Sequence, residues 1–99
     1  MQHAFIRTEW LIGKQALEKL SRSTVAVFGI GGVGSFAVEA LARSGVGKLV
    51  LIDHDDVCIT NLNRQIHADL STVGKPKVEV MRQRVLGINP NADVVCHAE

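Results

Sequence analysis

A glycine-rich turn constrains the fold of this chain more than any other feature of its sequence. Residues 29–34 read Gly-Ile-Gly-Gly-Val-Gly and lie between an apolar run, residues 24–28, and a small-residue segment with helical spacing. Between a strand and a helix, this glycine spacing allows a tight turn, close approach of a phosphate to the backbone, and close helix–strand packing. The free amides that begin the helix would then face an anion. The phosphate-binding glycines are predicted to be Gly29, Gly31, Gly32 and Gly34.

The remaining periodicities predict a β-α-β-α-β unit behind an N-terminal helical segment. We expect helices over residues 9–22 (bent near Gly13), 33–44 and 76–88, and strands over residues 24–29, 47–53 and 93–97. The expected apolar positions are Leu11, Ala16, Leu17 and Leu20 in the first helix and Val78, Met81, Val85 and Ile88 in the last. The fold class is therefore α/β, a Rossmann-like half of a doubly wound parallel sheet with right-handed crossovers.

The size of this unit bears on its domain organisation. Buried parallel strands need neighbours and cover on both faces, and a dinucleotide-type fold normally supplies a second half-sheet. We therefore interpret residues 1–99 as a single nucleotide-binding domain, the N-terminal part of a longer one. A self-sufficient smaller unit is the alternative.

Composition excludes several classes of protein. A net charge of +1 and 4% aromatic residues give no electrostatic or stacking case for nucleic-acid binding. Residues 1–9 lack the apolar core of a signal peptide, and the sequence has no apolar run of the roughly 18 residues that a membrane helix needs, so neither secretion nor membrane spanning is expected. Cys58 and Cys96 lack metal or disulfide spacing and predict free thiols in a reducing cytoplasm. The four histidines fit no ligand spacing, so no metal site is predicted.

An acidic residue closes the second apolar run. Asp53 follows Gly34 by nineteen residues, where a carboxylate would accept hydrogen bonds from a ribose hydroxyl. Capping of the next turn is the alternative role. The polar stretch after it, residues 54–72, is too long for an ordinary strand–helix connection, which indicates a functional segment.

Cations in two segments decide which nucleotide is expected. Lys75 and Lys77 stand at the start of the last predicted helix, where each unpaired cation costs about 0.3–1 kcal/mol against the helix dipole. A bound anion would turn this unfavourable contribution of the lysines into a favourable one. Together with Arg64 they suggest a longer phosphate chain than the pyrophosphate of NAD, and hence ATP. Asp55 and Asp56 could hold its Mg²⁺, but a solvated, hydrogen-bonded loop is the favoured explanation of these two carboxylates.

At these residues the chain resembles the ThiF/MoeB/HesA family of ubiquitin-activating-type adenylating enzymes. The family pattern occurs here in four ordered pieces, at residues 29–34, at Asp53, at residues 55–65 and at residues 74–77. Residues 7–13 and 56–61 most resemble the tRNA threonylcarbamoyladenosine dehydratase (TcdA-like) branch.

The resemblance implies a reaction in which a carboxylate attacks the α-phosphate of Mg-ATP, giving an acyl adenylate and pyrophosphate. In the dehydratase branch the carboxylate belongs to threonylcarbamoyladenosine of tRNA. In MoeB- and ThiF-like branches it is the C-terminus of a ubiquitin-like sulfur carrier. A homodimer, a tRNA substrate and a sulfur-transfer or ubiquitin-like partner are implied by the resemblance only.

The resemblance also assigns roles to residues. The positions it assigns to nucleotide binding after the glycines are Asp53, Asp55, Asn61, Arg64, Gln65 and Lys77, with Gln65 supporting the loop. The catalytic groups are Arg64, Lys77 and Arg7, the last an arginine finger that crosses the dimer interface. A second family arginine is replaced by Ala4. The family's magnesium-binding aspartate and any catalytic cysteine would lie beyond residue 99, so we expect residues 1–99 alone to be inactive.

Two other functions remain compatible with these residues. An NAD(P)-dependent oxidoreductase and a non-catalytic nucleotide-sensing domain share the glycine turn. Asn61 could be a turn residue and Arg64 a surface ion-pair partner. The carboxylates near Cys58 predict a raised thiol pKa and a structural role for that cysteine.

Overall fold

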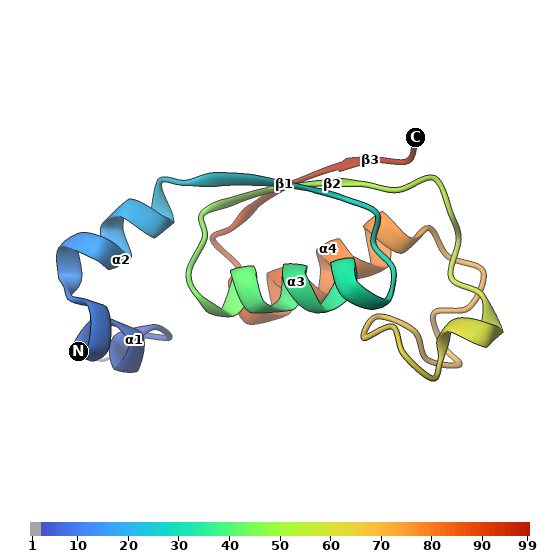
Figure 1. Ribbon diagram of the computed structural model, residues 1–99, viewed down its shortest axis with the longest axis horizontal. Helices are drawn as coiled ribbons and strands as arrows, with labels where there is room; N and C mark the ends of the chain where they lie inside the picture. The colour runs from blue at the N-terminus through green and yellow to red at the C-terminus, as the bar shows by residue number, and fades with distance from the viewer. Residues whose placement is uncertain (1–2) are drawn as a thin grey trace.

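The computed structural model describes residues 3–99 as a three-stranded parallel sheet with two helices against one face (Figure 1). The elements in chain order are α1 (Ile6–Ile12), α2 (Lys14–Ser21), β1 (Thr24–Phe28), α3 (Gly32–Arg43), β2 (Lys48–Ile52), the 3-10 turn η1 (Ile59–Asn61), α4 (Lys77–Ile88) and β3 (Asp93–His97). The strand order is β1-β2-β3, with both pairs parallel. The predicted β-α-β-α-β unit and fold class are confirmed.

The N-terminal helical segment differs from its prediction. It begins at Ile6 rather than Glu9. The break expected near Gly13 is confirmed: the segment divides there into two helices, and the φ of Gly13, +88°, lies in the left-handed region. The break changes the direction of the chain, so the apolar side chains of α1 do not form one continuous stripe with those of α2. Leu11 is consequently 87% exposed, and its predicted place in a buried stripe is wrong. Leu17 still packs, because its Cδ1 lies 3.3 Å from where a side chain at Gly45 would begin.

The core lies between the sheet and helices α3 and α4. Leu49 and Leu51 of β2 point into it and are fully buried, as are Met81 and Val85 of α4. The complete buried cluster is Ile30, Val38, Ala42, Val46, Leu49, Leu51, Val78, Met81 and Val85. Each large member contributes about 1.5–3 kcal/mol by leaving water. The predicted buried face of α4 is confirmed, with Ile88 partly buried at its end.

An ion-pair network ties the two helices together beside this core. Glu39 of α3 accepts hydrogen bonds from Arg84 Nε of α4 at 2.6 Å and from Arg43 Nε at 2.8 Å. The hydrogen bond from Arg84 is the main reason that the pKa of Glu39 is lowered. The network thus fixes α4, which begins at the candidate site, against α3, which begins at the same site.

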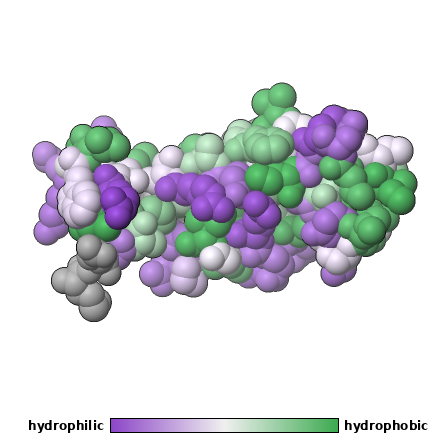
Figure 2. Space-filling model, turned by 90° about the horizontal axis from the view of Figure 1, so that it is seen from below, coloured by the Kyte–Doolittle hydropathy of each residue, from purple (hydrophilic) through white to green (hydrophobic). Residues whose placement is uncertain are grey.

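The other face of the sheet carries no helix among residues 3–99 (Figure 1). Ala26, Val50 and Val95 form one row across it, and Phe28 at the end of β1 is 79% exposed. From the helix side, hydrophobic residues gather at the end of the molecule that carries the 59–73 loop (Figure 2). The exposed members there are Ile59, Leu62, Leu70 and Val73.

Cys58 and Cys96 are free thiols, as the sequence predicts. Burial raises the pKa of Cys96, which donates a hydrogen bond to the Val78 carbonyl at 3.4 Å. No helix within residues 3–99 combines the length and the apolar character needed to cross a bilayer.

Candidate functional site

The glycine turn joins β1 to α3 at the carboxyl edge of the sheet. Gly29 has a φ of +86°, and a side chain at Gly34 would place its Cβ only 1.8 Å from the Gly29 carbonyl oxygen. The last glycine is therefore required for the turn to pack against its own helix. Helix α3 begins at Gly32, one residue before its prediction, with Gly31 as N-cap.

Amide groups at this turn are available for an anion. The first intrahelical bond of α3 runs from the Ser35 amide to the Gly31 carbonyl at 2.9 Å. The amides before Ser35 have no intrahelical acceptor, which is the general condition of a helix N-terminus. With the helix dipole, these amides make the turn suited to a phosphate.

Asp53 connects the end of β2 to this turn. One carboxylate oxygen, Oδ2, accepts a hydrogen bond from the Ile30 amide at 2.6 Å, and the other, Oδ1, accepts from the Asp55 amide at 2.8 Å. These bonds hold the carboxylate beside the glycine turn. Because a carboxylate oxygen has more than one lone pair, each can still accept a ribose hydroxyl.

The polar segment after Asp53 returns to the start of α4. Asp56 and Pro76 form an isolated antiparallel bridge, and the Val57 amide donates to the Lys75 carbonyl at 2.8 Å. The Lys77 amide, the first of α4, donates to the Asp55 carbonyl at 3.1 Å. These contacts bring the lysine-bearing start of α4 to the same edge as Asp53.

The facing segment, residues 59–67, forms the wall of the site opposite the glycine turn. The side-chain carbons Cγ and Cδ of Arg64 lie 3.8 Å from where a Cβ at Gly32 would stand, and Gln65 Nε2 lies 3.8 Å from the corresponding point at Gly31. The Ile66 amide donates to Ser35 Oγ at 3.3 Å. The predicted neighbourhood of Arg64, Gln65 and the glycine turn is therefore present.

The two predicted cations differ in their surroundings. The Arg64 guanidinium is exposed and donates to the Thr60 carbonyl at 3.1 Å and to Asn63 Oδ1 at 3.0 Å. Lys77 is only 7% exposed. Burial is the main reason that the pKa of His67 is lowered and a hydrogen bond from Thr60 the main reason that the pKa of Cys58 is lowered, and the charge of Lys77 adds a smaller contribution to both. Arg64 and Lys77 thus belong to the same edge of the sheet as the glycine turn.

Asn61 holds the turn that presents Arg64. Its Oδ1 accepts from the Cys58 amide at 2.8 Å, and its carbonyl accepts from the Arg64 and Gln65 amides at 3.2 and 3.0 Å. The turn role that the sequence left open is therefore present. A phosphate contact by its Nδ2 stays a prediction.

The thiol of Cys58 departs from its prediction. Thr60 Oγ1 donates a hydrogen bond to the Cys58 sulfur at 3.3 Å and is the main reason that its pKa is lowered. Hydrogen bonds to the sulfur favour the thiolate more than desolvation disfavours it. The predicted rise of the Cys58 pKa is therefore wrong.

An acidic cluster lies at the outer rim of the site. Ligand atoms of Asp53, His54 and Asp55 lie within 4.8 Å of one another. Asp53 is already bound by two backbone amides, and His54 Nε2 lies 3.2 Å from Asp55 Oδ1. Mg²⁺ prefers an octahedron of oxygen ligands, which this set does not supply by itself.

Arg7 lies away from all of these residues. Helix α1 stands at the opposite end of the molecule from the glycine turn (Figure 1). There the Arg7 guanidinium stacks over Trp10, 5.7 Å from the ring centroid. Within one chain, Arg7 therefore does not join the site.

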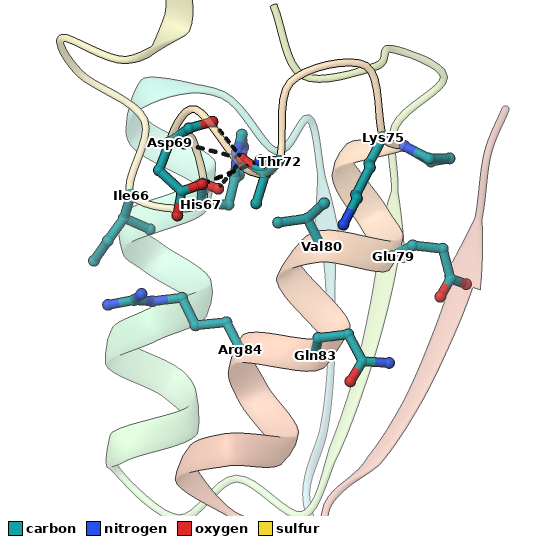
Figure 3. A pocket seen from close by; sticks show the side chains of 10 residues that line it. Ile66, His67, Asp69, Thr72, Lys75, Glu79, Val80, Gln83 and Arg84 are labelled. Atoms are coloured by element: carbon teal, nitrogen blue, oxygen red, sulfur yellow. Dashed lines mark hydrogen bonds between the residues drawn. The ribbon is translucent and has the colours of Figure 1, made fainter.

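Two features of the site were missed by sequence reasoning. His67 is buried and its Nε2 lies 2.8 Å from the Ile30 carbonyl oxygen. Beside it, between the 66–76 segment and α4, is a cavity of about 470 Å³ (Figure 3). Its lining includes Ile66, His67, Asp69, Thr72, Lys75 and Arg84. The only local signal for His67 was its position two residues after Gln65, in a segment already expected to be functional.

Comparison with known proteins identifies the family. The sequence profile of the ThiF family matches residues 6–99. The chain belongs to the ThiF family. It is 63% identical over 95 residues to the tRNA threonylcarbamoyladenosine dehydratase of Bacillus subtilis, which covers 96% of this chain and 37% of that protein.

A solved structure of a second dehydratase and an adenylyltransferase extend the comparison. The crystal structure of the Escherichia coli tRNA threonylcarbamoyladenosine dehydratase TcdA in complex with ATP superposes with a TM-score of 0.95 and 50% identity, covering 97% of this chain and 40% of that one. The molybdopterin-synthase adenylyltransferase of Salmonella typhimurium is 46% identical over 78 residues, which is 78% of this chain and 31% of that protein. The chain thus spans well under half the length of these relatives.

Proposed function

We propose that this chain binds ATP and forms the nucleotide site of an enzyme that adenylates a carboxylate. The observation that carries the proposal is the placement of Arg64 and Lys77, from separate segments, at the edge that bears the glycine turn. The ATP complex of the E. coli relative supports the choice of nucleotide. An NAD(P)-dependent oxidoreductase is less favoured because it gives these two cations no role.

In the proposed reaction the substrate carboxylate attacks the α-phosphate of ATP and pyrophosphate leaves. The residues of this site supply positioning and charge rather than a nucleophile. The amides of the glycine turn and the side chains of Arg64 and Lys77 would neutralise the phosphates, while Asp53 would accept the ribose hydroxyls. Asn61 and Gln65 would keep the facing segment in place.

We propose threonylcarbamoyladenosine of tRNA as the substrate, since the B. subtilis relative carries that name at 63% identity. Activation of a ubiquitin-like sulfur carrier is the second candidate, favoured by the similarity to the molybdopterin-synthase adenylyltransferase. Mg²⁺ would accompany the triphosphate. Because Asp53, His54 and Asp55 do not form a complete magnesium site, we assign no step to the metal ion here.

Arg7 can serve this reaction only from another copy of the chain. Its helix lies at the far end of the molecule from the glycine turn, so a finger role requires a homodimer that places α1 of one copy over the site of the other. Mixing Arg7→Ala and Arg64→Ala variants of the complete protein tests this. Restored activity in the mixture is the expected result, and its absence would contradict the shared site.

The nucleotide itself is tested by thermal shift and calorimetry on the complete protein with Mg-ATP and with NAD. We expect stabilisation by Mg-ATP only. Arg64→Ala and Lys77→Met should each weaken ATP binding roughly 10- to 100-fold, the range for a lost hydrogen bond to a charged group. Arg22→Ala, an exposed arginine after α2, is the control and should bind ATP normally. Stabilisation by NAD as well as by Mg-ATP, with equal losses of both in the Arg64 and Lys77 variants, would contradict the phosphate assignment.

A further inference from the structure

His67 is a buried histidine for which the proposed reaction has no use. It is 3% exposed, and its Nε2 lies 2.8 Å from the Ile30 carbonyl oxygen, across 37 residues of sequence. Since a carbonyl only accepts hydrogen bonds, Nε2 carries the proton and Nδ1 is the bare nitrogen. Nδ1 has no hydrogen-bond partner among residues 3–99. Within residues 3–99 the imidazole therefore makes a single hydrogen bond, and its partner belongs to the glycine turn.

The surroundings of His67 keep it in this neutral form. Burial lowers the pKa of its imidazole, the hydrogen bond to Ile30 partly opposes that effect, and the charge of Lys77 lowers the pKa further while Asp53 raises it. On its other side the ring borders the 470 Å³ cavity with Lys75 and Arg84 (Figure 3). In its neutral form the imidazole donates through Nε2 and leaves no unpaired N–H at the buried Nδ1 position.

The Ile30 carbonyl that His67 bonds belongs to the same peptide unit as the Gly31 amide. This unit is planar and trans, so its C=O and N–H bonds point in opposite directions. His67 holds the carbonyl on the inner side, and Asp53 holds the preceding peptide through the Ile30 amide. The Gly31 N–H must then point away from His67, and it donates no hydrogen bond within residues 3–99.

We propose that His67 is a positioning residue that aims the Gly31 amide at the phosphates of the bound nucleotide. This inference rests on the proposed function. His67 acts through the Ile30 peptide and does not touch the ligand. A side chain of equal bulk without a donor leaves the peptide free to rotate, so phosphate binding weakens while binding of the nucleoside part is retained.

The test compares His67→Leu, which fills the space without a donor, with His67→Gln, whose amide can reach the carbonyl, in the complete protein. We expect His67→Leu to bind Mg-ATP about tenfold more weakly, and adenosine with unchanged affinity, by calorimetry. His67→Gln should recover most of the loss. His3→Gln, at the far end of the molecule, is the control. ATP binding by His67→Leu that equals the wild type, or equal losses of ATP and adenosine, would overturn the proposal.

A second measurement needs no variant. The backbone amide resonance of Gly31 in the wild-type protein should shift strongly on addition of Mg-ATP and much less on addition of adenosine. An unmoved Gly31 resonance with ATP bound would also overturn the proposal. Absence of ATP binding by the wild type would instead refute the proposed function, so the two failures are distinguishable.

Discussion

The two walls of the site are held by different forces. The glycine turn, residues 29–34, is fixed by backbone packing, because the space beside Gly34 is filled by the Gly29 carbonyl. The facing segment, residues 59–67, is held by polar side chains that bond to backbone groups, namely Asn61 to Cys58, His67 to Ile30 and Ser35 to Ile66. The close packing of the turn therefore requires that position 34 has no side chain, whereas the facing segment depends on particular side chains, one of which, His67, also bonds to the turn.

The largest effect is expected from Gly34→Ala. Its Cβ would stand 1.8 Å from a backbone oxygen that has no flexible side chain to move aside. We expect a loss of about 3 kcal/mol or more in the free energy of unfolding, or failure to fold, measured by chemical denaturation of the complete protein.

Gly32→Ala is the matched control for this prediction. Its methyl group would meet only Arg64, with the nearest side-chain carbons at 3.8 Å, which is ordinary contact. The fold should survive this change, while ATP affinity falls because the methyl group enters the phosphate side of the turn. Equal destabilisation by the two alanines would show that backbone packing at Gly34 does not fix the turn.

A smaller effect is expected in the facing segment from Asn61→Ala. The Cys58 amide would lose its acceptor at a position where Asn61 is 6% exposed, which costs about 1–3 kcal/mol. Asn61→Asp retains the acceptor oxygen and should keep most of the stability, but its charge should weaken ATP binding. Asn91→Ala, an exposed asparagine before β3, is the control. If both alanine variants unfold at the same denaturant concentration, the segment is held by something else.

The smallest effect is the pH dependence that His67, in the facing segment, gives to the free energy of unfolding. The unfolded imidazole of His67 has a pKa near 6.5, and the folded pKa is lower, chiefly because of burial. Between the two values the unfolded state binds more protons, so stability falls as the pH drops below about 6.5. One proton limits this slope to about 1.4 kcal/mol per pH unit. His67→Gln should lack this part of the slope in denaturation curves from pH 7.5 to 5.5; identical slopes would contradict the assignment.

Much of this molecule is determined by its sequence alone, because the controlling interactions are local. The glycine spacing, the strand and helix periods and Pro76 at the start of α4 act over a few residues, so the α/β fold and the glycine turn were predictable. The family pattern added the convergence of Arg64 and Lys77 on that turn. The error at Leu11 arose because Gly13 changes the direction of the chain, and a helical period does not report which way a break turns it.

Only the tertiary structure decided which residues hold the site together. The bond from the Ile30 amide to Asp53 spans 23 residues, and the bond from His67 to the Ile30 carbonyl spans 37. Neither leaves a periodic signal, because each depends on how two loops meet after the sheet has formed. The same holds for Arg7, whose distance from the glycine turn follows from the direction of β1 between them. Local sterics thus determine the turn, and long-range packing determines what faces it.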